Sequence, residues 1–297
     1  MLTVPIGGID VLSTLGPLSM LSDDPTVRLR PGRFERATVT PDGIGALTVT
    51  WDVGGSDAHV ETYGDGADWL AERAPALLGC ADDVAGFAPT ASPLRELWAR
   101  HSGDRIGRTA TLWHDLAWFI LQQRVRRQEA SAQWRRFVTA LGTPGPGPSG
   151  LVAPPDPAVL ARLAYHDLHQ FGIERQRADH LLHAARAARQ LQRLVDADVD
   201  RALPALRSVR GIGPWTASCL VTHTWGARDT VILGDDGIPS LVAWLLAGER
   251  RADDARMVEL LEPYRPHRAR VVRLAFLSGV RPPRRAPGRP RTDIRRR

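Results

Sequence analysis

The chain has 297 residues, of which 43% are hydrophobic and 24% charged, and its formal net charge is +6. This length and composition fit a soluble globular protein with room for two domains, and they exclude a fibrous or largely disordered chain. Because only two cysteines occur, Cys80 and Cys219, a disulfide framework, a four-thiolate zinc site and a cysteine-ligated iron–sulfur cluster are excluded as well.

The sequence carries no sign of a membrane segment or of export. No apolar run approaches the roughly 20 residues that a membrane-spanning helix needs, and residues 1–10 lack the positive start of a secretory signal. We therefore expect no membrane partner and a cytoplasmic location.

All 39 basic residues are arginines, because the sequence contains no lysine. This excludes a Schiff base on a lysine side chain. Arginine suits a phosphate-bearing partner, although a GC-rich genome produces the same composition. Residues 281–297 hold eight arginines and one aspartate, so the preceding 280 residues carry a net charge of −1. Any positive face on the folded body must therefore come from local clustering.

Between residues 27 and 63, apolar and polar side chains alternate in period two, with breaks at Thr40–Gly43 and Gly54–Asp57. This pattern predicts short antiparallel strands joined by turns. After Gly66 the apolar spacing becomes helical, first at residues 67–73 and then from Pro93 onward.

Helices are predicted over most of the remaining chain. The run 111–138 has helical spacing and must end before the glycine- and proline-rich residues 142–150. Further helices are predicted at 158–165, 175–194, 199–208 and 214–224. The fold class is therefore α+β and mostly α, with a small antiparallel β-rich domain at 1–90, a helical domain at 91–282 and a basic disordered tail at 283–297. The tail either contacts DNA phosphates or is simply solvated.

A glycine-containing turn separates the last two of these helices. Gly211 and Gly213 flank Ile212, and Pro214 suits the first position of the second helix. Glycines let the backbone approach another surface closely, and the free N–H groups at the start of a helix bind a phosphate. The segment 203–224 thus predicts two helices joined by a hairpin that can hold a nucleic-acid strand.

This segment resembles the helix-hairpin-helix of DNA glycosylases, and in particular the 3-methyladenine DNA glycosylase II family, in which the string Gly-Ile-Gly-x-Trp-Thr-Ala also occurs. The resemblance implies an N-terminal β domain, an all-α helix-hairpin-helix glycosylase domain and double-stranded DNA with a damaged base as partner. It also implies a monomer that acts at the nucleoid and requires no cofactor. A monovalent cation at the hairpin would map to the main-chain carbonyls of Arg207, Val209 and Gly211.

In that superfamily a catalytic aspartate lies a little over twenty residues beyond the hairpin, at the start of a helix. Counting without gaps from Gly211 places Asp235 there, with Ile238 as the apolar residue three positions later; Asp236 is the fallback. A carboxylate suits the reaction, because breaking an N-glycosidic bond builds positive charge on the sugar. An N-capping role alone is the alternative for Asp235.

The position four residues after Gly211 separates two classes of these enzymes. Glycosylases with lyase activity carry a lysine there, whereas this chain has Trp215. The resemblance therefore implies a monofunctional hydrolase without lyase activity. It also makes Trp215 a wall of the base pocket, where an electron-rich ring would stack on a positively charged alkylated purine, and it places Cys219 and Phe276 in the same pocket.

Two further stretches match the family. The string Ile120-Leu-Gln-Gln-Arg-Val125 resembles the family segment that enters the duplex, which makes Gln123 a minor-groove contact and Arg124 the candidate wedge beside the extruded nucleotide. Residues 266–276 resemble the last helix of the family, with His267 in place of a tryptophan. At the hairpin, the implied DNA contacts are Gly211, Gly213 and Thr216.

Two other functions fit parts of the sequence. Asp236 and Gly237 stand where well-known family members have an aromatic and an apolar residue, so a glycosylase for deaminated bases is one alternative. A non-catalytic DNA-binding protein that uses the hairpin and the basic tail is the other. We expect the hydrolysis of alkylated purines in base excision repair.

Overall fold

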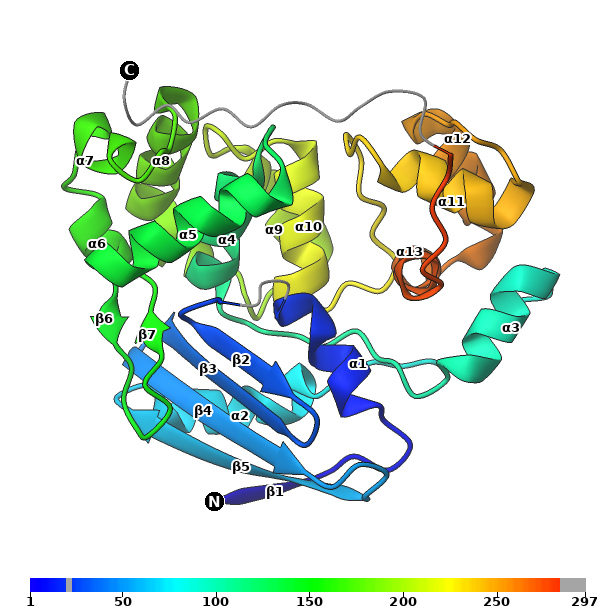
Figure 1. Ribbon diagram of the computed structural model, residues 1–297, viewed down its shortest axis with the longest axis horizontal. Coiled ribbons are helices and arrows are strands. Elements are labelled where there is room, and N and C mark those ends of the chain that lie inside the picture. Colours follow the sequence, from blue (N-terminus) through cyan, green and yellow to red (C-terminus); the bar gives the residue numbers. More distant parts are fainter. Residues whose placement is uncertain (20–22, 284–297) are drawn as a thin grey trace.

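The computed structural model describes residues 1–19 and 23–283. Figure 1 shows a β-sheet below a first block of helices, with a second block of helices to one side. The predicted tail at 283–297 lies outside the described residues apart from Pro283. In the described part of the chain, no helix is long and apolar enough to cross a membrane.

The sheet has five antiparallel strands in the order β1-β5-β4-β3-β2. Their bounds are Leu2–Pro5 (β1), Val27–Arg30 (β2), Arg33–Thr40 (β3), Gly43–Trp51 (β4) and Asp57–Gly64 (β5). The predicted breaks at residues 40–43 and 54–57 lie at the β3–β4 and β4–β5 turns, and Gly43 takes a φ of 130° there. Helix α2 (Ala67–Leu77) packs on β4 and β5, and the short helices α1 (Val11–Leu15) and η1 (Gly16–Leu18) connect β1 to β2.

The first helical block shares its hydrophobic core with the sheet. It consists of α4 (Leu112–Gln122), α5 (Arg127–Leu141), α6 (Pro157–Leu160), α7 (Tyr165–His169), α8 (Arg175–Gln192), α9 (Val199–Arg207) and α10 (Pro214–Thr224), with the small hairpin β6 (Thr143–Pro144) and β7 (Val152–Ala153) between α5 and α6. Phe34 and Leu47 of the sheet belong to the same buried cluster as Leu116 and Leu220 of the helices. The sheet therefore forms the base on which this block is built.

The second helical block has a core of its own. It combines α3 (Ser92–Arg100) with α11 (Ile238–Ala247), α12 (Asp254–Leu261), η2 (Glu262–Tyr264) and α13 (Arg268–Leu277). Leu94 from the early segment is buried together with Val242, Met257 and Leu274 from the late one. The chain thus enters this block twice, as Figure 1 shows for α3 beside α13.

Buried ion pairs attach α13 to the segment that leads into and out of α3. Arg270 contacts Asp82 at 2.7 Å with both side chains only 1% exposed, and Arg273 contacts Asp104 at 2.8 Å. The guanidinium of Arg270 also lies over the rings of Phe87 and Trp98. These contacts fix the position of the last helix, because a buried charge that lost its partner would be strongly unfavourable.

The predicted α+β class is confirmed, with more residues in helices than in strands. The division at residue 90 remains a prediction. Two predicted elements are wrong in detail. The helix predicted at 158–165 ends at Leu160, and α7 begins at Tyr165. The run 111–138 is not a continuous helix but ends at Gln122 and restarts at Arg127. The cause is local, since Arg124 takes a φ of 59°, which a right-handed helix does not permit.

We expect Asp82→Ala to lower the free energy of unfolding by about 3–5 kcal/mol, because Arg270 would stay buried without its counter-charge. The neighbouring variant Asp83→Ala removes a carboxylate that is 56% exposed and should cost about 1 kcal/mol or less. Urea denaturation of both variants measures the difference. Equal destabilisation would show that the buried pair does not hold α13 in place.

Candidate active site

The turn between α9 and α10 has the predicted hairpin form. Gly211 has a φ of 95°, and a Cβ placed on it would lie 2.4 Å from Cγ of His180. A Cβ on Gly213 would meet nothing within 4 Å, so this residue faces open space. Ile212 is buried between them and anchors the turn. The hairpin therefore packs on its inner side through Gly211 and leaves its outer side free at Gly213.

Helix α10 begins without any side chain capping its first turn. Its first N–H groups consequently lack acceptors within the helix, and they face the surface on which Gly213 is exposed. Free N–H groups and the positive end of the helix dipole favour an anion at this place. The hairpin can thus bind a phosphate group.

Gln123 connects the hairpin to the corner between α4 and α5. Its Nε2 donates to the carbonyl oxygen of Gly211 at 2.9 Å and to Oγ1 of Thr216 at 2.8 Å. Nδ1 of His180 donates to its Oε1 at 2.8 Å. The side chains of Gln123 and Thr216 are thus engaged inside the protein, and their contacts with DNA remain predictions.

Arg124 lies at the tip of the same corner. Its side chain is exposed, and its φ of 59° is unusual for a residue other than glycine. The hydrogen bonds of Gln123 hold this corner in place. An exposed residue with a strained backbone at such a corner is suited to enter a DNA duplex. The wedge role of Arg124 remains a prediction.

The predicted cation ligands lie along this hairpin. The Gly211 carbonyl accepts from Gln123, and the carbonyl of Val209 accepts from the Ile212 N–H at 3.0 Å. The described residues contain no group of three or more histidine, cysteine or acidic side chains that could hold a metal. A cation held by main-chain carbonyls alone remains a prediction.

Asp235 joins the two helical blocks at the start of α11. Its Oδ1 accepts the backbone N–H groups of Gly237 at 2.8 Å and Ile238 at 2.9 Å, while its Oδ2 accepts from Nε1 of Trp215 at 2.9 Å. Asp235 is half-buried, whereas Asp236 is exposed. The structure therefore brings Asp235 and Trp215 together and leaves the fallback Asp236 in solvent.

Cys219 lies one turn beyond Trp215 on α10 and is buried. Burial, together with the nearby charge of Asp235, raises the pKa of its thiol, so that Cys219 is an uncharged apolar wall. Phe276 stands near the end of α13 and is 52% exposed, which leaves its ring accessible to a ligand. The convergence of Phe276 with Trp215 and Cys219 remains a prediction.

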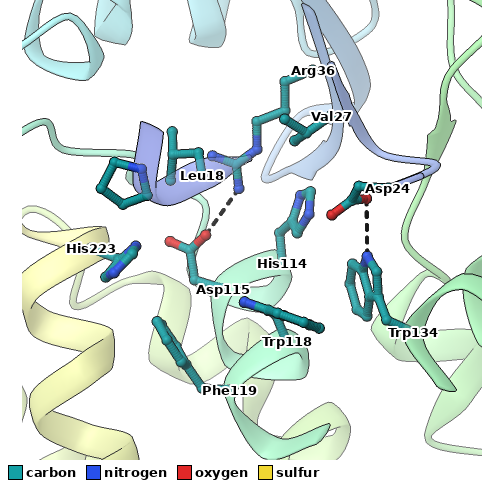
Figure 2. A pocket seen from close by; sticks show the side chains of 11 residues that line it. Leu18, Asp24, Val27, Arg36, His114, Asp115, Trp118, Phe119, Trp134 and His223 are labelled. Carbon is teal, nitrogen blue, oxygen red and sulfur yellow. Dashed lines mark hydrogen bonds and ion pairs between the residues drawn. The ribbon is translucent and has the colours of Figure 1, made fainter. Parts of the chain in front are cut away.

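A recess that the sequence did not reveal lies beside Phe119 (Figure 2). Phe119 makes an edge contact with Trp215 at a centroid distance of 6.2 Å and another with His223 at 5.0 Å, so it separates the Trp215 corner from the recess. The lining residues are Pro17, Leu18, Asp24, Val27, Arg36, His114, Asp115, Trp118, Phe119, Trp134 and His223. They come from η1 and the loop that follows it, from strands β2 and β3, and from helices α4, α5 and α10. No regular spacing in the sequence connects them.

The recess contains the ion pair of Arg36 and Asp115 and the imidazole rings of His114 and His223. Arg36 contacts Asp115 at 2.9 Å, and both side chains are buried. Burial lowers the pKa of His223 to about 4, although the charge of Asp115 acts in the opposite direction. Burial and the charge of Arg36 hold the pKa of His114 well below its usual value. Both imidazoles are therefore neutral at physiological pH.

The sequence resembles two curated proteins over part of its length. No family model matches the chain. DNA-3-methyladenine glycosylase 2 of Escherichia coli is 33% identical over 115 residues, which is 38% of this chain and 39% of that protein. YfjP of Bacillus subtilis is 23% identical over 156 residues, or 50% of this chain and 52% of that protein. The matches thus span about half the length of these curated relatives or less.

Solved structures match over much more of the chain. A 3-methyladenine DNA glycosylase from Archaeoglobus fulgidus has a TM-score of 0.79 at 20% identity and covers 93% of this chain and 98% of its own. An 8-oxoguanine glycosylase/lyase from Clostridium acetobutylicum, in complex with double-stranded DNA, has a TM-score of 0.63 at 13% identity and covers 85% and 97%. At these identities the likeness shows a shared fold.

The two hairpin glycines should respond differently to alanine. Gly211→Ala forces a positive φ and a contact with His180, so we expect it to lower the free energy of unfolding by about 1–3 kcal/mol. Gly213→Ala should change it by about 0.5 kcal/mol or less, because its Cβ enters open space. Thermal denaturation compares the two. A strongly destabilised Gly213→Ala protein would contradict the exposed position of this glycine.

The buried histidines predict a stability that depends on pH. Because the pKa of His223 is about 4 in the folded state and 6.5 in the unfolded state, the unfolded chain binds more protons between these values. The free energy of unfolding should therefore fall as pH drops from 6.5 to 4, with His223 contributing up to about 1.4 kcal/mol per pH unit. Urea denaturation at several pH values measures this slope. His223→Gln should make it shallower, and an unchanged slope would refute the assignment.

Proposed function

We propose that this chain is a DNA glycosylase of the 3-methyladenine DNA glycosylase II family and that it hydrolyses the N-glycosidic bond of alkylated purines in duplex DNA. The observation that supports this most is the hydrogen bond between Asp235 and Trp215, which holds a carboxylate beside an aromatic ring and close to the hairpin. A carboxylate, a ring and a phosphate-binding turn are the three parts that excision of an extruded base needs.

Asp235 is the catalytic carboxylate of this proposal. Three N–H groups donate to its two oxygens, and the start of α11 places the positive end of a helix dipole beside it. These interactions fix the direction of the carboxylate. As the bond between sugar and base breaks, the deoxyribose becomes positively charged, and the negative charge of Asp235 stabilises this state while water adds to the sugar.

The reaction ends at the abasic site. A lyase step through a lysine Schiff base is not open to this protein, because its sequence contains no lysine and Trp215 occupies the family position of that residue. The products of the proposed reaction are therefore a free base and DNA with an intact backbone.

DNA approaches the hairpin face in this proposal. The first turn of α10 binds one phosphate through its N–H groups, and five exposed arginines on the two corners surround it: Arg124, Arg126, Arg127, Arg207 and Arg210. In the described part of the chain, none of these side chains forms an ion pair with a carboxylate. They supply the local positive charge that the nearly neutral body lacks.

Arg124 fills the gap that the extruded nucleotide leaves. Gln123 holds the Arg124 corner on the hairpin, so the phosphate-binding turn and the wedge residue move together.

We also propose that the protein is a monomer, that its two domains divide at residue 90 and that it requires no cofactor. A monovalent cation would bind the main-chain carbonyls of Arg207, Val209 and Gly211 at the hairpin.

Asp235→Asn should abolish release of 7-methylguanine from duplex DNA while it preserves DNA binding, because the amide keeps the size of the side chain and removes its charge. Asp236→Asn is the matched control and should keep at least about half of the activity, since its side chain is exposed. Single-turnover assays with chromatographic detection of the free base give the rates. Full activity in Asp235→Asn, or loss of activity only in Asp236→Asn, would refute the assignment.

A further inference from the structure

The recess beside Phe119 is not used by the catalytic step. Phe119 contacts both Trp215 and His223, and His223 lies eight residues or about 12 Å beyond Trp215 on α10. Phe119 thus links the recess to the Trp215–Asp235 pair, where the sugar of an extruded nucleotide lies in the proposed function. The side chains of the recess are the candidates for reading which base has entered.

Asp24 is the acidic lining residue with an unused carboxylate oxygen, whereas the carboxylate of Asp115 is paired with Arg36. Its Oδ1 accepts the N–H of Thr26 at 2.8 Å, the hydroxyl of Thr26 at 2.6 Å and the indole N–H of Trp134 at 3.1 Å. Its Oδ2 has no hydrogen-bond donor among residues 1–19 and 23–283. Figure 2 shows this second oxygen turned away from Trp134 and toward the interior of the recess.

The charges around Asp24 leave its carboxylate uncompensated. Arg36 is paired with Asp115, and His114 and His223 are neutral. The described lining of the recess therefore carries a net charge of −1 when Asp24 is ionised. Burial raises the pKa of Asp24, and the hydrogen bonds from Thr26 and Trp134 together with the charge of Arg36 act in the opposite direction.

Resting on the proposed function, we infer that Asp24 is a specificity-determining residue whose negative charge selects positively charged purines. A purine alkylated at a ring nitrogen carries a positive charge while it is attached to the sugar, and a nearby carboxylate in a poorly hydrated recess offsets the cost of removing that charge from water. The rings of Trp118 and Trp134, which lie 5.8 Å apart, add their electron-rich faces. A neutral deaminated purine gains neither attraction.

The test compares one cationic with one neutral lesion in the same duplex, 7-methylguanine and hypoxanthine, under single-turnover conditions. Asp24→Asn removes the charge and keeps the acceptor for Thr26 and Trp134, and Asp24→Glu keeps the charge. Asp23→Asn is the matched control, because Asp23 is exposed and lies one residue outside the recess. Circular dichroism and affinity for undamaged duplex establish that each variant folds and binds DNA.

We expect Asp24→Asn to slow release of 7-methylguanine about tenfold, the factor that corresponds to one pKa unit of charge interaction. Release of hypoxanthine by Asp24→Asn should stay at the wild-type level, whether that level is measurable or zero. The rates of 7-methylguanine release by Asp24→Glu and Asp23→Asn should stay within about threefold of the wild-type rate.

Two results would overturn the inference while leaving the proposed function intact. One is an unchanged rate for Asp24→Asn on 7-methylguanine. The other is an equal loss in Asp24→Asn and Asp24→Glu, which would mark a structural role. If the wild-type protein releases neither base, the proposed function fails and this inference fails with it.

Discussion

The hydrogen bond from Trp215 to Asp235 is the contact on which the candidate active site depends. Trp215 belongs to the helical block that shares a core with the sheet, and Asp235 opens the first helix of the block with a separate core. The two blocks are built independently, so the carboxylate is placed only where they meet. The backbone donors of Gly237 and Ile238 fix its other oxygen.

The parts that would handle DNA are coupled in a similar way. His180 packs against Gly211 and hydrogen-bonds Gln123, and Gln123 in turn hydrogen-bonds the hairpin. The corner that carries Arg124 therefore cannot move without disturbing the turn that would hold a phosphate. The same corner is the break between α4 and α5, where the positive φ of Arg124 interrupts a sequence of otherwise helical character.

The arginines on the surface and those in the interior have different roles. Arginines around the hairpin are exposed and have no acidic partner among residues 1–19 and 23–283, which suits a polyanion. Arg36, Arg270 and Arg273 are instead paired with carboxylates inside the protein. The buried pairs position structural elements, because either partner alone would be costly in a poorly hydrated interior. In the proposed mechanism the carboxylate of Asp235 meets the sugar and that of Asp24 meets the base.

The sequence by itself determined the class of the fold, the strands between residues 27 and 63 and the hairpin around Gly211. These features are local, since period-two spacing, helical spacing and a positive φ at glycine all act over short distances. The resemblance to a known family pointed to Asp235, and its catalytic role stays a prediction. Only the tertiary structure decided that residues 92–100 join the late helices and that Gln123 is engaged with the hairpin. It also decided that Asp24, Trp118 and His223 line one recess. Such contacts join residues up to about two hundred positions apart. Side-chain packing between distant elements leaves no periodic pattern in the sequence from which it could be predicted.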